Sequence, residues 1–325
     1  MPATTTEARR PPRTVPPDDA GSRRRVVYLA GSGHTGSTLL ALLMNTHPAV
    51  ASVGEVAVKP RIRHRNDAHR QKCSCGALVG DCGFWRRIFQ QVNEQGLEFG
   101  PDTWTNDYRF THPLLHRVFT RESSHALVRA FRGWSERRLP AYRRRIGFID
   151  RVNAAFVDAV LEATEADVFF DTSKGAVRLA RLLASPEFDV RVVTLVRDVR
   201  AFAASARRRG VSLAEAAGTW KKDQLTIRRE VAALSPDRRT LLRYEDLCAD
   251  PAATLRRLCD FCGVAHAEFP RRLFSHEHHV LGNNMRMAGP IEVRLDQRWR
   301  AELTESDQAK AVRIAGSLHR EFGYD

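Results

Sequence analysis

The sequence lacks an uninterrupted apolar run long enough to form a membrane-spanning helix. Its longest candidate, residues 26–44, is broken by glycines, hydroxyl residues and a histidine, whereas a spanning helix needs about 20 predominantly apolar residues. The first 25 residues also lack the apolar stretch of a secretory signal. We therefore expect no transmembrane segment and a cytoplasmic location.

Features that mark nucleic-acid-binding proteins are missing as well. The chain has no run of interleaved aromatic residues that could stack on bases, and its cysteines and histidines do not follow zinc-finger spacing. The formal net charge of +14 nevertheless suits negatively charged ligands. We therefore expect an anionic small-molecule ligand rather than nucleic acid.

The chain divides into a short tail and one domain. Residues 1–25 contain six arginines and five prolines without an apolar stretch, which is typical of a disordered basic tail. Residues 26–325 contain enough apolar residues for a core and are interpreted as a single domain. Within it, residues 56–165 show no clear strand pattern, so we expect a largely helical insertion there.

Alternating strand and helix patterns predict the fold class. Apolar, β-branched runs at residues 26–30, 167–170 and 190–196 predict buried strands, and helical patterns follow at residues 37–45 and between the later strands. Such alternation indicates an α/β fold with a mostly parallel central sheet flanked by helices. Ligands of such sheets bind outside the carboxyl ends of the strands.

A glycine-rich loop follows the first predicted strand. We expect its glycines to allow positive backbone angles and close approach, so that backbone N–H groups and the positive end of the next helix face one anion. The loop is similar to a P-loop but lacks the lysine that precedes the hydroxyl residue, which argues against a nucleoside triphosphatase. The expected anion-binding residues are Ser32, Gly33, His34, Thr35, Gly36, Ser37 and Thr38.

A second anion site is predicted at the end of the strand at residues 190–196. Arg197 ends this strand, and Ser205 lies two turns into the helix that follows. Arginine offers a planar fork of donors and serine a neutral donor, and both suit a phosphate group.

In their order along the chain, these motifs resemble the sulfotransferases that use 3′-phosphoadenosine 5′-phosphosulfate (PAPS). The resemblance covers most of residues 26–263 and implies a P-loop-like sulfotransferase architecture. It also implies that the first loop holds the 5′-phosphosulfate and that Arg197 and Ser205 hold the 3′-phosphate. The matching motifs are residues 31–40, Thr46-His47-Pro48 with Gly54-Glu55, residues 171–174, residues 197–205, residues 243–247 with Asp250-Pro251, and more weakly residues 282–286 and Trp299.

The resemblance and the residues together suggest two catalytic groups for in-line sulfuryl transfer from PAPS to a hydroxyl acceptor. Glu55 is the expected general base, since a glutamate in the matching Gly-Glu position has this role in similar sulfotransferases, and His47 is the rival base. Lys174 is placed to stabilise the oxygen that bridges phosphate and sulfate. We expect Asp171 to orient its neighbours and no metal ion to be required.

One residue departs from the family pattern. Many relatives carry arginine or lysine at the position of His34, so a fixed positive charge in the loop is replaced by a side chain that titrates near neutrality. We expect anion binding to favour protonated His34 and affinity to rise as the pH falls through the histidine range.

Two other functions remain open at this point. A small-molecule kinase would use magnesium and a strand-end acid such as Asp171, with Lys174 or Arg197 replacing the missing loop lysine. A nucleotide-binding protein without catalysis would not need Glu55. The acceptor, whether a small molecule, a carbohydrate or a lipid, and the oligomeric state are not defined by the pattern.

The six cysteines fall into two groups. Cys248, Cys259 and Cys262 follow helical spacing and are interpreted as small core residues. Three further thiols lie within ten positions, and free thiols, a disulfide and a zinc site completed by His64 or His69 all remain open for them, although the spacing is not a standard zinc pattern. These thiols are Cys73, Cys75 and Cys82.

Overall fold

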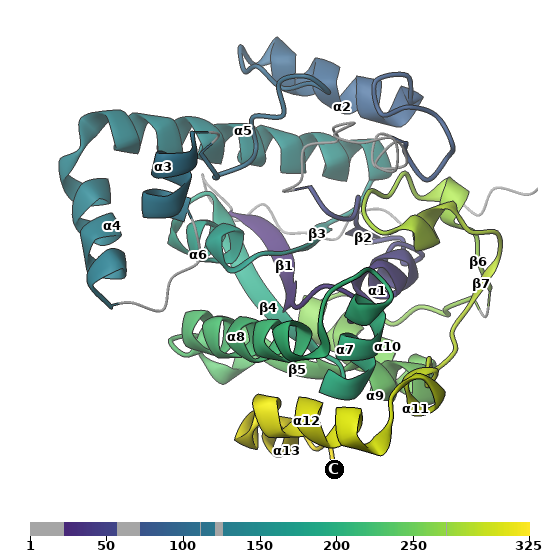
Figure 1. The fold of residues 1–325 in the computed structure, drawn as a ribbon. Helices are drawn as coiled ribbons and strands as arrows, with labels where there is room; N and C mark the ends of the chain where they lie inside the picture. Colours follow the sequence, from purple (N-terminus) through teal and green to yellow (C-terminus); the bar gives the residue numbers. More distant parts are fainter. Residues whose placement is uncertain (1–22, 57–71, 111, 121–125, 271) are drawn as a thin grey trace, which may run out of the picture.

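The fold is built on one sheet of five parallel strands in the order β2-β3-β1-β4-β5 (Figure 1). The computed structural model describes residues 23–56, 72–110, 112–120, 126–270 and 272–325. The parallel sheet confirms the predicted α/β class. The strands are β1 (Arg24–Gly31), β2 (Val50–Ala51), β3 (Val168–Lys174), β4 (Phe188–Val196) and β5 (Arg239–Arg243).

Alternation of side chains along β1 creates two buried layers. Val26 and Tyr28 belong to one cluster, together with residues of α2 (Gly83–Glu94) and α5 (Pro140–Thr164). Val27 and Leu29 belong to a second cluster, with α1 (Ser37–Met44) and α10 (Pro251–Cys262). Successive strand residues point to opposite faces, so one buried strand supports both layers.

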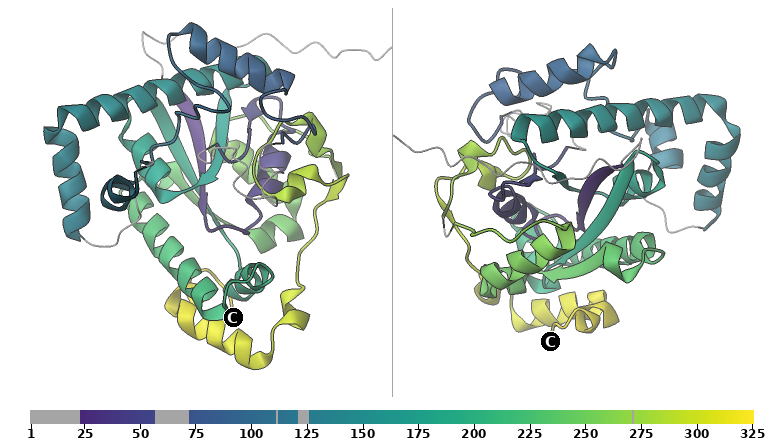
Figure 2. Two further views of the ribbon diagram at one scale, coloured as in Figure 1. Left: turned by 45° about the horizontal axis from the view of Figure 1, so that its top comes forward. Right: turned by 180° about the vertical axis from the view of Figure 1, so that it is seen from behind.

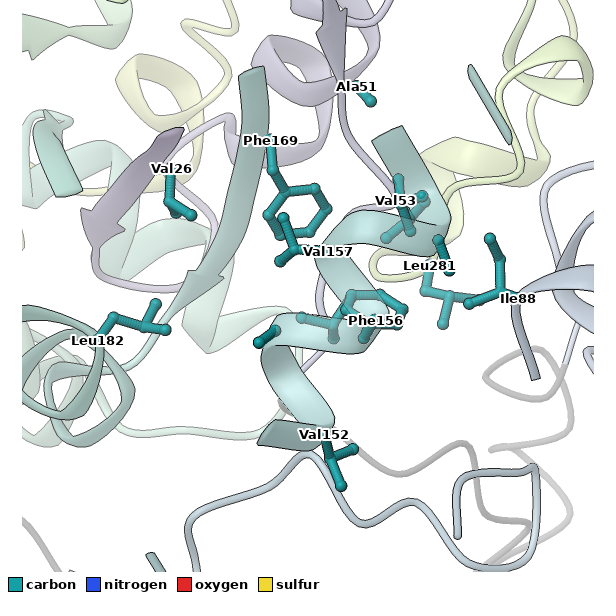
Figure 3. Packing of buried hydrophobic residues seen from close by; sticks show 14 of the residues in the cluster. Val26, Ala51, Val53, Ile88, Val152, Phe156, Val157, Phe169, Leu182 and Leu281 are labelled. Atoms are coloured by element: carbon teal, nitrogen blue, oxygen red, sulfur yellow. The ribbon is translucent and has the colours of Figure 1, made fainter. Parts of the chain in front are cut away.

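The first layer is rich in aromatic side chains. Phe156 of α5 packs against Phe169 of β3, with ring centroids 5.8 Å apart (Figure 3). Its ring also stacks on Trp85 of α2, with centroids 6.1 Å apart. All three side chains are essentially inaccessible to solvent. Each buried ring contributes on the order of 1.5–3 kcal/mol of hydrophobic stabilisation, so this contact fixes α5 and α2 to the sheet.

The remaining helices complete the two layers and add a third cluster. The C-terminal helices pack against α7 and α8, at the end of the molecule opposite α2 (Figures 1 and 2). None of the helices in the described part of the chain is both long and apolar enough to cross a membrane. These helices are α6 (Ala176–Ala184), α7 (Val199–Arg207), α8 (Leu213–Val231), α9 (Tyr244–Ala249), α11 (Trp299–Glu302), α12 (Glu305–Ala315) and α13 (Ser317–Glu321).

Two element boundaries differ from the sequence-based expectation. β1 begins at Arg24 rather than at residue 26, so two arginines assigned to the tail belong to the sheet; residues 1–22 of that tail lie outside the described residues. β3 continues through Lys174, where a turn was expected from Asp171, because the chain still pairs with β1 there. In its described part, the segment expected to be largely helical, residues 56–165, contains α2, α3 (Pro113–Leu115), a short π-helix (His116–Thr120), α4 (Ala126–Arg138) and α5.

The sheet has a switch point between β1 and β3. These strands are neighbours, but the helices that follow them, α1 and α6, contribute to different buried clusters on opposite faces. Chains that leave adjacent parallel strands in opposite directions open a crevice at the carboxyl ends, where ligands of α/β proteins bind. The glycine-rich loop and Lys174 both lie at this edge.

A buried ion pair anchors the end of β3. Arg178 of α6 donates to the Asp171 carboxylate at 2.7 Å and to Asn153 of α5 at 2.8 Å. Asp171 also accepts the backbone N–H of Ser173 at 2.9 Å. In this network Asp171 holds the Arg178 side chain and the Ser173 backbone; that it orients its neighbours for function stays a prediction.

Removing one partner of that pair should destabilise the protein strongly. We expect Arg178→Ala to lower the free energy of unfolding by about 3–5 kcal/mol, because it leaves the Asp171 carboxylate buried without its cation. The matched control is Arg207→Ala, which breaks the exposed Arg207–Asp307 pair and should cost about 0–1 kcal/mol. Denaturant unfolding of the three proteins measures both effects; similar losses in the two variants would contradict the assignment.

Candidate active site

Two glycines, one at the end of β1 and one in the loop after it, are required by their surroundings. Gly36 has a φ of 94°, and a Cβ there would lie 2.5 Å from the ring of Tyr244. A Cβ on Gly31 would lie 2.7 Å from the carbonyl oxygen of Leu195. Gly33 has neither requirement, since its φ is not positive and a Cβ there would meet no atom within 4 Å; its contact with an anion stays a prediction. The tight left-handed position is His34, with a φ of 62°.

The hydroxyl residues of the loop lie next to and within the first turn of α1. Thr35 donates its hydroxyl to the carbonyl oxygen of Ser32 at 2.9 Å, which closes the turn. The Ser32 hydroxyl in turn accepts from the Gln224 amide of α8 at 3.3 Å. Ser37 and Thr38 form the first turn of α1, where free backbone N–H groups and the helix dipole favour an anion.

Lys174 joins the loop to Glu55. Its ammonium group donates to Ser37 Oγ at 3.1 Å and to Glu55 Oε1 at 2.5 Å. The side chains of Lys174 and Glu55 are 14% and 24% exposed, so the pair is shielded but reachable. The sequence separates these three residues by up to 137 positions, and the structure brings all three together as predicted.

The end of β3 aims the Lys174 side chain. The register between β1 and β3 shifts after Tyr28, and Lys174 then pairs with Ala30 in a left-handed conformation, with a φ of 67°. The Tyr28 hydroxyl donates to the carbonyl oxygen of Gly175 at 2.8 Å and fixes the chain beyond the strand. A non-glycine residue held at positive φ is uncommon and often marks a functional position.

Glu55 is held by a distant segment of the chain. Its backbone N–H donates to the carbonyl oxygen of Leu281 at 3.2 Å, and the Leu281 N–H donates to Val53 at 2.8 Å. Gly54 has a φ of 80°, and a Cβ there would lie 1.9 Å from the Leu281 oxygen. The next N–H, of Val56, donates to the Ser173 hydroxyl at 3.2 Å. Only the weak match at residues 282–286 pointed towards this contact.

His47, the rival base, has both ring nitrogens engaged by backbone. Nε2 lies 2.7 Å from the carbonyl oxygen of Ala265, and Nδ1 accepts the N–H of Ala49 at 3.0 Å. The side chain is buried. A ring held in this way secures the turn after α1 and has no nitrogen left to take a proton from a substrate.

Arg197 is placed at the carboxyl end of β4 as predicted, but it is more enclosed than expected. Its guanidinium donates to the carbonyl oxygen of His34 at 3.1 Å, pairs with Asp296 at 3.2 Å and stacks on the Tyr244 ring. The buried Nε has no hydrogen-bond partner in the described chain, so one donor remains unused. In the described part of the chain, the Ser205 hydroxyl forms no hydrogen bond. Its binding of a 3′-phosphate therefore stays a prediction.

The sequence pattern did not predict that Arg209 lies beside His34. Arg209, just beyond α7, lies 3.0 Å from His34 Nε2 through its own N–H group, which places a fixed positive charge beside the loop. Burial, followed by the charges of Arg209 and Lys174, lowers the pKa of His34 to about 4. His34 is therefore neutral at pH 7 in the free protein. The run of three arginines at residues 207–209 was the available signal, although it does not say which one reaches the loop.

Because the pKa of His34 is lowered, we expect the free energy of unfolding to depend on pH. Between pH 6.5 and 4 the unfolded chain binds more protons at this residue than the folded chain, so unfolding becomes easier as the pH falls. We expect the loss between pH 7 and 5 to be smaller in His34→Asn by about 1 kcal/mol, allowing for solvent screening. Asparagine tolerates the left-handed backbone and does not titrate. Denaturant unfolding at both pH values measures the difference; equal pH profiles would show that His34 does not contribute.

Comparison with known proteins agrees with this architecture. A model of the sulfotransferase family matches residues 27–268. The sulfotransferase domain of the olefin synthase from Synechococcus PCC 7002 is 19% identical, with a TM-score of 0.53 over 95% of this chain and 98% of that domain. A sulfotransferase domain from the curacin biosynthetic pathway is 18% identical, with a TM-score of 0.51 over 94% of this chain and 99% of that domain. These two structures share the fold, and no curated protein sequence matches. The family match covers most of the chain, which therefore belongs to the sulfotransferase family.

Proposed function

We propose that the protein transfers the sulfuryl group of PAPS to a hydroxyl acceptor, with Glu55 as general base and Lys174 as the cation at the leaving side. The observation that carries the proposal is the contact of one ammonium group with both Ser37 of the anion loop and the Glu55 carboxylate. A sulfuryl donor held by the loop and an acceptor beside Glu55 would therefore meet next to Lys174.

The proposed step balances without a metal ion. The acceptor oxygen forms a bond to sulfur as its proton passes to the Glu55 carboxylate. The bond between sulfur and the bridging oxygen breaks, and its electron pair stays on the phosphate of adenosine 3′,5′-bisphosphate. Lys174 stabilises this growing charge from its place beside Ser37, as a preorganised cation does in a shielded site.

The pairing in the free protein has a consequence for binding. Lys174 and Glu55 neutralise each other before the donor arrives, so neither charge is buried alone. A phosphosulfate in the loop would compete for the Lys174 ammonium. That competition would loosen its hold on Glu55 and leave the carboxylate available to the acceptor hydroxyl.

The kinase alternative is less well supported by the site. Its strand-end acid, Asp171, is fully buried and paired with Arg178, so it is not available to a magnesium ion. Family membership also favours sulfuryl over phosphoryl transfer.

Mutation should separate the roles of the two catalytic residues. Turnover is measured with PAPS against a panel of small-molecule, carbohydrate and lipid alcohols, by mass spectrometry of products heavier by one SO₃. We expect Glu55→Gln to lower turnover by about 10²-fold or more with little loss of donor binding. Lys174→Ala should lower turnover by about 10²–10³-fold and also weaken donor binding.

The acidity of the acceptor discriminates between the two roles. A more acidic hydroxyl needs less help in losing its proton, so it should partly rescue Glu55→Gln and do much less for Lys174→Ala. Glu94→Gln, an exposed change on α2, is the matched control and should retain full turnover. If Glu55→Gln also retains full turnover, the proposed base is wrong; if no acceptor is sulfated by the unmodified protein, the proposed activity is wrong.

Arg197 should contribute selectively to recognition of the 3′-phosphate. We expect Arg197→Ala to weaken adenosine 3′,5′-bisphosphate by about tenfold to hundredfold, as for loss of a charged hydrogen bond, and adenosine 5′-phosphate by much less. Arg197→Lys keeps the charge without the fork and should show an intermediate loss. Calorimetric titration measures both nucleotides, and equal losses for the two would contradict the assignment.

A further inference from the structure

A cluster of three thiols and one imidazole lies outside the proposed active site. Its ligand atoms all lie within 4.8 Å of one another, and they come from two segments about 200 residues apart. We call it the Cys3His cluster, and its members are Cys73, Cys75, Cys82 and His279. The histidines considered from the sequence, His64 and His69, lie outside the described residues.

The spacing of these atoms fits one tetrahedral ion. Zinc binds sulfur at about 2.3 Å and imidazole nitrogen at about 2.0–2.1 Å, so the edges of its tetrahedron are about 3.6–3.8 Å long. The sulfur atoms of Cys75 and Cys82 are 3.7 Å apart. His279 Nδ1 lies 3.5 Å from the sulfur of Cys73 and 3.3 Å from that of Cys82. Small side-chain shifts from distances that all lie within 4.8 Å would give zinc its full bond lengths.

The backbone arranges the thiols before any ion binds. Gly76, with a φ of 93°, closes a turn in which its N–H donates to the Cys73 oxygen and the Cys73 N–H donates to the Ala77 oxygen, both at 2.9 Å. This turn presents Cys73 and Cys75 to the same point. Cys82 stands at the N-terminus of α2, whose dipole favours a thiolate.

The backbone conformation and the ring orientation of His279 are also fixed by its neighbours. It adopts a left-handed conformation with a φ of 50°, and its ring stacks on Phe84 at a centroid distance of 4.8 Å. The indole N–H of Trp85 donates to its carbonyl oxygen at 3.3 Å. These contacts orient Nδ1 towards the thiols. A metal site would use such an imidazole as a ligand, whereas a disulfide or a set of free thiols has no need of one.

We propose that the Cys3His cluster binds one structural zinc ion. Three thiolates and an imidazole in tetrahedral arrangement suit zinc rather than magnesium or calcium, which take oxygen ligands. Four protein ligands leave no position for a substrate or a reactive water molecule, so the ion serves structure and not chemistry.

The ion would tie the segment that carries the thiols to the segment whose Leu281 holds Glu55. Ser74 donates its N–H to the Val280 oxygen at 3.3 Å and accepts the Val280 N–H on its hydroxyl at 2.9 Å. The next residue, Leu281, forms the backbone contacts with Val53 and Glu55 and belongs to the same buried cluster as Ile88 of α2 (Figure 3). The zinc site thus secures the backbone of Glu55; only its importance for catalysis depends on the proposed function.

Metal content tests the proposal without any activity assay. Protein expressed in zinc-supplemented medium should carry about one zinc ion per chain by elemental analysis and by native mass spectrometry, with X-ray absorption showing three sulfur ligands and one nitrogen ligand. Replacement by cobalt should give the thiolate charge-transfer and tetrahedral d–d absorption bands. Protein without bound metal, or a denatured mass lower by two hydrogens because Cys75 and Cys82 form a disulfide, would overturn the proposal.

Variants locate the ion. Cys75→Ser and His279→Asn should each weaken zinc binding by about tenfold or more, and asparagine tolerates the left-handed backbone at residue 279. His279→Cys should retain zinc as a four-thiolate site. Cys248→Ser, outside the cluster and similarly half-buried, is the matched control and should keep its zinc. Full zinc content in both Cys75→Ser and His279→Asn would overturn the proposal.

Hydrogen exchange tests the link to Glu55. Chelation of the zinc from the intact protein should speed exchange of the Glu55 and Leu281 amides by about tenfold or more, while amides in the middle of β4 stay protected. Unchanged exchange at Glu55 and Leu281 after metal removal would refute the structural role of the ion. A zinc-loaded protein that sulfates no alcohol would leave this result intact and count only against the proposed function.

Discussion

The arrangement of the candidate active site depends on the contact between Lys174 and Glu55. An ammonium group and a carboxylate at 2.5 Å, both largely shielded from water, satisfy each other and contribute little net stability as a pair. Their value lies in position, because the same ammonium group also reaches Ser37 at the start of α1. A single cation therefore lies between the start of α1, where we propose that the sulfuryl donor binds, and the carboxylate that we propose as the general base.

Each partner in this contact depends on a different part of the sheet. Ser37 follows β1, Lys174 ends β3, and Glu55 lies just after β2, so three neighbouring strands meet at one edge. The switch point between β1 and β3 opens that edge, and the buried Asp171–Arg178 pair keeps the end of β3 from moving. Positive φ values at Lys174 and Gly54 bend the chain where the side chains must turn inward. Packing elsewhere offsets this local strain.

The sequence predicted what depends on local pattern. Strand runs, the glycine-rich loop, the strand-end residue Arg197 and the position of Lys174 just beyond a strand follow from hydrophobic periodicity and from short motifs, and the parallel sheet then places them at one edge. The boundary of β3 was wrong because pairing with β1 carries the strand past Asp171. The motif does not show which loop residues need a left-handed backbone: the structure places positive φ at His34 and Gly36 and not at Gly33.

Contacts between distant segments could not be predicted from the sequence, because no local pattern encodes them. Leu281 meets Glu55, Arg209 meets His34, and His279 meets the thiols near residue 80 only after the chain has folded. All three contacts act on the same edge of the sheet, directly or through one short backbone ladder. The charge that His34 does not carry at neutral pH is supplied by Arg209, so the loop keeps a positive environment in spite of its unusual residue. Local motifs thus supply the groups that we propose to react, and long-range contacts determine where those groups point and which of them is charged.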